Sequence, residues 1–211
     1  MFLKLRTSSN QKIGVSSDLH LGHNRDFIFS KRGYASLEDH SEGVINILNE
    51  MFSENDILIL LGDFCLNTTE EKFEEYLSKI KCQNIYTLWG NHPNPMRKIY
   101  NREVFSKYGE NVEVYPFRYK NLIFMGDYVE ATINGYSCIL CHYPISVWNH
   151  MQHGSFMLCG HSHNSFPESR KTEANSKILD CGWDGHGKPY IFNEIVELFK
   201  NRINKKVDHH A

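Results

Sequence analysis

The sequence lacks an apolar run long enough to cross a membrane, and its first residues, Met1 to Arg6, lack the apolar core of a signal peptide. It also has no excess of charge, because 23 basic side chains oppose 25 acidic ones for a formal net charge of −2. This balance excludes the strongly basic surface that drives generic nucleic-acid binding. No internal repeat or low-complexity segment interrupts the chain. We therefore expect a cytoplasmic protein with no membrane partner.

Cysteine occurs at six positions, but not in the dense pattern of a small disulfide-stabilised protein. Cys138 and Cys141 have the spacing of half a zinc knuckle. They lie in an alternating, strand-like run, however, in which residues i and i+3 face opposite sides. We therefore interpret the cysteines as buried, reduced thiols. At 211 residues the chain is long enough for one well-packed domain, which we place at residues 1–203, with a polar C-terminal tail at 204–211.

Hydrophobic patterning predicts alternating strands and helices in the first half of the chain. Continuous apolar runs predict buried strands at 13–15, 57–61 and 85–89. Amphipathic spacing predicts helices from Ser36 to Phe52, from a cap at Thr68 or Thr69 to Ile80, and from Met96 to Tyr108. This alternation is typical of βαβ units with parallel strands.

The second half reads mainly as strands, and Asn134-Gly135 marks a two-residue hairpin turn. The expected strands are 112–115, 122–125, 128–133, 136–140, 155–159, 178–180 and 190–192. Asn193 is the expected cap of a last helix from Glu194, and residues 182–187 are expected to form a turn. We predict an antiparallel sheet here, and hence an α/β (α+β) fold in which two sheets form a β-sandwich flanked by helices.

Ligand-type side chains stand where five of these strands end, namely Asp18, His20, Asp63, Asn91, His92, His142, His161 and His163. Parallel sheets place their sites at the carboxyl ends of the strands, so we expect these residues to converge. Glycines beside several of them allow sharp turns and close approach. The set exceeds what one zinc ion requires and fits two metal ions with a shared bridge, which activate a water for in-line phosphoryl displacement. Asp63 is the natural bridge, because a carboxylate has two oxygens.

The motifs Asp18-Leu19-His20, Gly62-Asp63, Gly90-Asn91-His92, His142 and Gly160-His161-Ser162-His163 together resemble those of the calcineurin-like metallophosphoesterases. Residues 18–24 and 141–144 resemble the small bacterial and phage members. The resemblance implies a four-layer α/β/β/α fold and two divalent ions, with Mn²⁺ favoured and Fe, Zn, Ni and Co as alternatives. It implies that one ion is held by Asp18, His20, Asp63 and His163, and the other by Asp63, Asn91, His142 and His161. His92 and Asn91 would be the catalytic residues, with His92 protonating the leaving oxygen or stabilising charge.

The residue after the Gly-Asn-His triplet departs from the family pattern. Many members have an acidic residue there, whereas this chain has Pro93, so the partner of the second His92 nitrogen is not identified. We predict that His23, Asn24 and Arg25 bind substrate. Arg25 could fork onto a phosphate, with a solvated loop charge as the equal alternative.

Other candidates favour packing over function. Tyr143 and Trp148 are predicted to pack under a loop, with stacking on a base as the less favoured alternative. His40 and His150 are predicted to be surface or packing residues.

We predict a dinuclear metal-dependent phosphoesterase in which a metal-bridging hydroxide attacks phosphorus. The substrate class is a small phosphate ester or nucleotide, and the resemblance favours a phosphodiester over a phosphomonoester. One alternative is a nuclease acting on DNA or RNA, which the neutral charge disfavours and which salt-dependent cleavage of oligonucleotides would reveal. Another is a non-catalytic scaffold with the same fold, against which the complete ligand set and His92 both count. The oligomeric state is left open.

Overall fold

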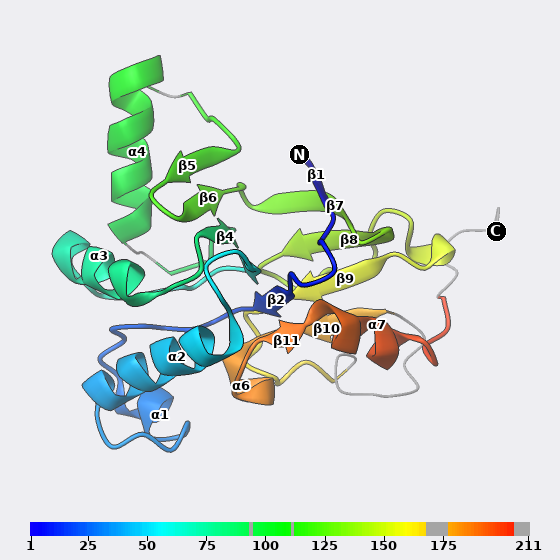
Figure 1. Cartoon of the computed structure of the whole chain (residues 1–211), viewed down its shortest axis with the longest axis horizontal. Coiled ribbons are helices and arrows are strands. Elements are labelled where there is room, and N and C mark those ends of the chain that lie inside the picture. The colour runs from blue at the N-terminus through cyan, green and yellow to red at the C-terminus, as the bar shows by residue number, and fades with distance from the viewer. Residues whose placement is uncertain (93–94, 111, 168–176, 205–211) are drawn as a thin grey trace.

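Two β-sheets pack face to face in the computed structural model, which describes residues 1–92, 95–110, 112–167 and 177–204 (Figure 1). The six-stranded sheet has the order β11-β2-β3-β4-β6-β5. Its strands are Tyr190–Ile191, Ile13–Ser16, Ile57–Leu60, Asn84–Thr87, Leu122–Phe124 and Phe117–Tyr119, in that order. The five-stranded sheet has the order β1-β7-β8-β9-β10. Its strands are Phe2–Leu5, Tyr128–Ile133, Tyr136–Cys141, Phe156–Cys159 and Ile178–Asp180. The predicted mixed α/β fold with two sheets is confirmed.

The centre of the six-stranded sheet is parallel. Strands β2, β3, β4 and β6 pair in one direction, with Ser16 opposite Leu60 and Leu60 opposite Thr87. All residues of β2 and β3 are buried, because the sheet is covered on both faces. The carboxyl ends of these strands therefore lie together at one edge, which is where the polar residues follow.

Three helices cover the outer face of this sheet: α2 (Leu37–Met51), α3 (Glu70–Lys79) and α4 (Pro95–Tyr108). Ser36 begins α2 by accepting a hydrogen bond from the backbone of residue 39, and Thr69 begins α3 in the same way. Their apolar faces form one buried core with the sheet. The two expected caps and the amphipathic spacing are thus confirmed.

The space between the two sheets forms a second buried core. Val15 and Ile59 point into it from one sheet, and Val129 and Leu140 from the other. Helix α7 (Phe192–Phe199) adds its buried face to the same core. The outer face of the five-stranded sheet is covered in part by the segment between β8 and β9, which contains the short 3₁₀ helix η1 (Met151–His153). Two sheets flanked by helices therefore enclose the cores, as expected.

The predicted antiparallel character of the second half holds for the β5–β6 pair, for β11 against β2 and for the β7–β8 hairpin. Asn134 and Gly135 turn it with φ angles of 48° and 92°, as a two-residue primed turn requires. Strands β8, β9 and β10 instead pair in parallel, and β1 pairs in parallel with β7. The connection of residues 142–155 is long enough to return the chain to the same end of the sheet, so the strand run did not imply antiparallel order.

Several local expectations were wrong. Residues 112–115 form no strand, because the Tyr100 hydroxyl pairs with both backbone groups of Val114, accepting at 2.9 Å and donating at 3.1 Å. The last helix starts at Phe192 without Asn193 as its cap, and Glu194 instead accepts from the backbone N–H of residue 191. The expected turn at 182–187 contains the single-turn helix α6 (Trp183–His186). Strands β1 and β5 and the short helix α1 (Asp26–Phe29) were not predicted.

Among the described residues, no helix combines the length and the apolarity needed to span a membrane. Pro93 and residues 205–211 of the predicted tail lie outside the described ranges.

Candidate metal centre

Five of the predicted ligands have a left-handed backbone. The φ angles are 57° at Asp18, 54° at His20, 49° at Asp63, 67° at His161 and 46° at His163. Each such conformation costs about 1 kcal/mol or more in a non-glycine residue and persists only where its surroundings enforce it. Here the backbone N–H of Asp18 donates to Gly62 O at 3.1 Å, and that of His20 donates to Asp63 O at 3.0 Å. Strain of this kind concentrates at functional sites, so these strand ends are candidates for one.

Glycine is required where neighbouring chains approach these carboxylates. A Cβ at Gly90 would lie 1.9 Å from Asp63 Oδ1, and a Cβ at Gly160 would lie 2.5 Å from Asp18 Oδ2. Neither buried carboxylate has room to move aside. The two glycines thus let strand ends 70 residues apart in the chain meet at one point.

A first group of ligand atoms joins Asp18, His20 and His163, which lie close enough together to hold one cation. Asp18 Oδ1 is 3.7 Å from His20 Nε2 and 3.8 Å from His163 Nε2. Asp18 and His20 are fully buried, and His163 is partly buried. Carboxylate oxygen and imidazole nitrogen are ligands for Mn, Fe, Co, Ni and Zn.

A second group joins Asp18, Asp63 and His142. His142 Nε2 lies 3.4 Å from Asp63 Oδ2. His142 Nδ1 is 2.9 Å from Leu61 O, and because a carbonyl can only accept, Nδ1 carries the proton and Nε2 keeps a lone pair. Asn91 Oδ1 is 2.8 Å from His142 Nε2 and 2.9 Å from His161 Nδ1, so the amide and His161 lie beside this group.

Electrostatics keep the carboxylates charged. Burial alone would raise the pKa of Asp18, but its electrostatic contact with His20 and the nearby His142 and His163 lower it to about 2. The pKa of Asp63 is also lowered, because its contact with His142 outweighs burial. The same contact raises the pKa of His142 against burial, whereas burial dominates at His20 and lowers its pKa. At neutral pH the site therefore presents two carboxylates that are ready to bind cations.

Unpartnered buried atoms indicate what would complete the site. Asp18 Oδ1 and both ring nitrogens of His20 are buried and have no hydrogen-bond partner. Leaving such groups unsatisfied costs about 1–3 kcal/mol each. With His142 neutral, its Nε2 and Asn91 Oδ1 are both acceptors, so a proton or a cation is needed between them. The donor set and its unpaired atoms therefore fit divalent metal ions.

Comparison with known proteins agrees with this geometry. The family model of calcineurin-like phosphoesterases matches residues 11–202 of the sequence, which include every predicted ligand. The chain belongs to the calcineurin-like phosphoesterase family. Membership implies a metal-dependent hydrolase that acts on phosphoesters, and the candidate ligand groups agree with a divalent-metal site.

Solved structures share the fold of this phosphoesterase. One of them is the crystal structure of the protein of unknown function AQ665 from Aquifex aeolicus, with 17% sequence identity and a TM-score of 0.61. The match covers 90% of this chain and 100% of that one. A search of curated proteins found no match. At this identity the likeness supports the fold alone.

A chain of charged groups behind the metal centre was missed by sequence reasoning. His163 Nδ1 lies 2.6 Å from Asp184 Oδ2, so this nitrogen donates to the carboxylate and Nε2 faces Asp18. The Arg32 guanidinium donates to the two carboxylate oxygens of Asp184 at 3.0 and 2.8 Å. It also donates to the backbone carbonyls of Asp18 and Leu19 at 2.8 and 2.9 Å. No local signal distinguishes Arg32 from a solvated arginine, and Asp184 lies in the segment expected to be a turn.

The contacts of Asp184 and Arg32 shift the pKa values of their neighbours. The hydrogen bond to Asp184 raises the pKa of His163. Burial of Asp184 would raise its own pKa, but His163 and Arg32 hold it well below its usual range. His40, expected to be a surface or packing residue, is fully buried with Nε2 2.9 Å from an Arg32 nitrogen, and burial together with this cation lowers its pKa to about 4.

The predicted catalytic histidine of the phosphoesterase borders the metal centre. The His92 backbone N–H donates to Asp63 Oδ1 at 3.3 Å, and its Nε2 lies 3.9 Å from Asp63 Oδ2. The side chain is 39% exposed, and its ring centroid is 5.7 Å from that of His20. His92 therefore has access both to the carboxylate and to solvent.

Two of the three predicted substrate-binding residues line a pocket beside the candidate metal centre. His23 and Arg25 line a pocket of about 320 Å³ that also includes His20, His92 and His163. Asn24 is exposed and does not line it. Phe27 and Asn67 do line it, and sequence reasoning missed both, because neither stands in a ligand motif.

The two aromatic candidates behave differently. Trp148 is buried, and its Nε1 donates to the backbone and the hydroxyl of Ser155, so its predicted packing under a loop is confirmed. Tyr143 is 48% exposed, and its ring centroid lies 4.6 Å from that of His161. His150 is exposed, in agreement with the expected surface role.

Proposed function

We propose that the chain is a dinuclear metal-dependent phosphodiesterase. The observation that supports this most is the convergence of two buried carboxylates and several imidazoles from distant strand ends, with buried ligand atoms that have no protein partner. In this proposal Asp18, His20, Asp63 and His163 would hold one ion. Asp63, Asn91, His142 and His161 would hold the other, so Asp63 would serve both.

The proposed cofactors are two divalent ions, with Mn²⁺ favoured and Fe, Zn, Ni and Co as alternatives. When bound, such ions supply an activated water and positive charge at the phosphoryl group. The protein prepares the site for them. Leu61 O holds the His142 ring so that Nε2 faces Asp63, and Asp184 holds the His163 ring so that Nε2 faces Asp18. This orientation reduces the reorganisation needed on binding.

His92 and Asn91 are the proposed catalytic residues. The partly exposed His92 can exchange protons with solvent and donate one to the leaving oxygen. Asn91 lies between His142 and His161 and would help stabilise developing charge at the phosphoryl group.

A small phosphate ester or nucleotide is the proposed substrate, and a diester is favoured over a monoester. The modest volume of the pocket beside His92 and the formal net charge of −2 support a small substrate over a nucleic acid. A nuclease remains the second candidate. The six cysteines are free and buried, which supports the proposed cytoplasmic location.

The test is hydrolysis by the pure protein with Mn²⁺. We expect cleavage of bis-p-nitrophenyl phosphate in preference to p-nitrophenyl phosphate, and loss of activity with a chelator. Asp63→Asn and His142→Ala should each lower kcat/KM by about 100-fold or more, and His92→Ala should lower kcat by about 100- to 10,000-fold. His153→Ala, at an exposed histidine in η1, is the matched control and should keep full activity.

Three results would count against the proposal. Full activity of Asp63→Asn or His142→Ala would refute the metal mechanism, and inactivity on both substrates with Mn²⁺ bound would favour the scaffold alternative. Cleavage of oligonucleotides that exceeds cleavage of the small diester and falls steeply with salt would favour the nuclease.

A further inference from the structure

The pocket beside the metal centre has a second part, with both apolar and polar side chains, that the proposed hydrolysis does not use. Four histidines of the site line one part of its wall. The remaining lining residues are Arg25, Phe27, Ile28, Leu66 and Asn67. Three of these residues, Phe27, Ile28 and Leu66, are apolar, and a volume of about 320 Å³ lies at the lower end of the range of small-molecule sites.

Phe27 presents an aromatic face to this pocket. It lies in the short helix α1, and 55% of its side chain is exposed, whereas its neighbours Ile28 and Leu66 are buried. The ring of His23 meets the Phe27 ring edge-on, with 6.1 Å between centroids and 80° between planes. This contact positions a phenyl ring that has room to stack against a planar ligand group.

Three polar side chains of the pocket have hydrogen-bonding capacity that the protein does not use. His23 Nδ1 is buried without a partner, and the His23 side chain is more than nine-tenths buried. Among the described residues, the Arg25 guanidinium and the Asn67 amide make no side-chain hydrogen bond or ion pair. Asn67 also has a left-handed backbone, with a φ of 53°, of the kind that concentrates at functional sites.

We propose that this pocket is the nucleobase subsite of a small nucleotide substrate. The base stacks on Phe27, the Asn67 amide pairs with its polar edge, and Arg25 binds the phosphate next to the metal centre. The assignment rests on the proposed function, because the metal centre is what places the phosphate at this end of the pocket.

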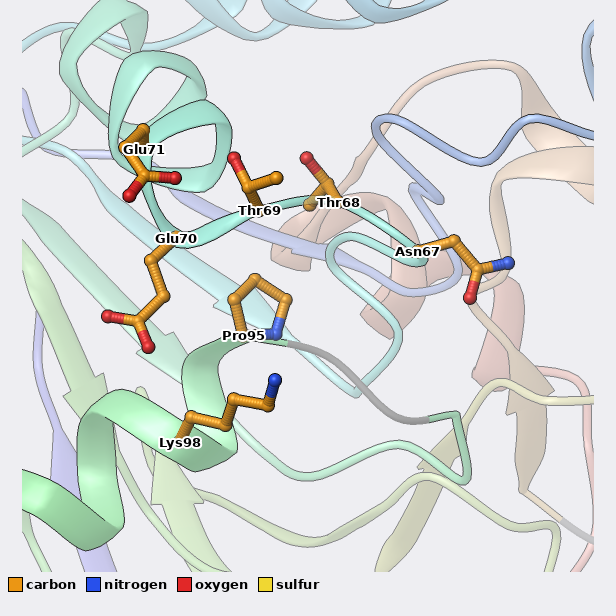
Figure 2. A pocket seen from close by; sticks show the side chains of 7 residues that line it. All are labelled: Asn67, Thr68, Thr69, Glu70, Glu71, Pro95 and Lys98. Atoms are coloured by element: carbon orange, nitrogen blue, oxygen red, sulfur yellow. The ribbon is translucent and has the colours of Figure 1, made fainter.

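The surroundings favour a single nucleotide over a strand. Asn67 also lines a neighbouring pocket of about 450 Å³, which is shown in Figure 2. Glu70, Glu71 and Lys98 are among the residues that line it. A second phosphate in that direction would meet a lining of mixed charge, in which Glu70 is paired with Arg102 at 2.6 Å, whereas sites that follow a nucleic-acid backbone are lined with basic groups.

Calorimetric titration of the Mn²⁺-loaded protein tests the subsite without relying on turnover. The probes are AMP, GMP, CMP and UMP, compared with methyl phosphate, which has the phosphate but no base. We expect at least one nucleotide to bind about 5- to 150-fold more tightly than methyl phosphate. Phe27→Ala should reduce this preference to within about twofold, and Phe27→Tyr should keep it.

Two further variants separate the roles of the pocket residues. Arg25→Gln should weaken the nucleotide and methyl phosphate alike, because the guanidinium contacts the part that they share. Phe105→Ala, at an exposed phenylalanine of α4 outside the pocket, is the matched control and should bind both probes as the wild type does.

The subsite is overturned if none of the four nucleotides binds the wild-type protein more than about twofold better than methyl phosphate, or if Phe27→Ala leaves the preference intact. Hydrolysis of bis-p-nitrophenyl phosphate would then still stand as evidence for the proposed function. The converse result, a Phe27-dependent nucleotide preference without hydrolysis, would retain the subsite and reject the catalytic proposal.

Discussion

Asp184→Asn tests whether the groups behind the metal centre control metal affinity. The substitution keeps the size of the side chain but removes the charge that both His163 and Arg32 contact. The amide can present its NH₂ group to His163 Nδ1, which would then have to act as an acceptor. That change moves the ring proton to Nε2, the nitrogen that faces Asp18. A protonated Nε2 cannot bind a metal ion.

The structure sets the expected magnitudes. Loss of a partner that orients a ligating histidine lowers metal affinity about 10- to 100-fold, which is about 1.4–2.7 kcal/mol. The substitution also leaves the Arg32 guanidinium, whose side chain is only 4% exposed, without its carboxylate. Because Asp184 is itself 23% exposed, we expect a loss of about 2–3 kcal/mol in the free energy of unfolding of the metal-free protein.

Mn²⁺ affinity should be measured by titration at about pH 8, where an ordinary histidine is neutral and protons compete little with the metal. Asp56→Asn is the control for destabilisation alone. Asp56 is a buried carboxylate that directly precedes β3, whereas Asp63 follows the other end of that strand. Asp56 accepts from the backbone N–H of Lys12 at 2.6 Å and of Ser53 at 2.7 Å. This control should lose stability and keep its Mn²⁺ affinity. An Asp184→Asn protein that binds Mn²⁺ within about twofold of the wild type would refute the reasoning.

Three further predictions address the close contacts, the pH dependence and the packing. Gly90→Ala should lose Mn²⁺ binding and about 1–3 kcal/mol of stability, because its Cβ would lie 1.9 Å from Asp63 Oδ1; unchanged titration and thermal melting curves would contradict this. Burial and a neighbouring guanidinium lower the pKa of His40 to about 4. Between about pH 6.5 and 4 the unfolded chain therefore binds more protons than the native protein, and the free energy of unfolding falls as the pH falls. We expect that, in urea unfolding without metal, the free energy of unfolding of the wild type falls between about pH 7 and 5 by about 2 kcal/mol more than that of His40→Gln. An equal fall in the two proteins would exclude this role of His40. Trp148→Phe should lower stability by about 1 kcal/mol through its lost bonds to Ser155 and keep full hydrolytic activity, whereas reduced activity at unchanged KM would contradict a purely structural role.

Local chemistry in the sequence was sufficient to predict that ligand-type side chains gather at the strand ends, and to predict the parallel half of the fold. A buried parallel strand is a continuous apolar run, and the residues after it must lie at the edge of the sheet, so Asp63 follows directly from the run 57–61. The short spacing of Asp18 and His20 and the glycine before Asp63 are equally local features. The caps Ser36 and Thr69 and the hairpin turn act within a few residues, and the sequence therefore predicted each of them.

Tertiary structure alone decided which distant groups support the site and which line its pocket. Arg32 and Asp184 are 152 positions apart, and the hydroxyl of Tyr100 replaces a predicted strand by pairing with Val114. Such contacts depend on where whole elements lie in space, and neither periodicity nor propensity records that position. The exposure of Phe27 beside the metal centre is of the same kind. The sequence determined the chemistry available at the strand ends, and packing determined what surrounds it, because side chains meet only after the sheets and helices have been assembled.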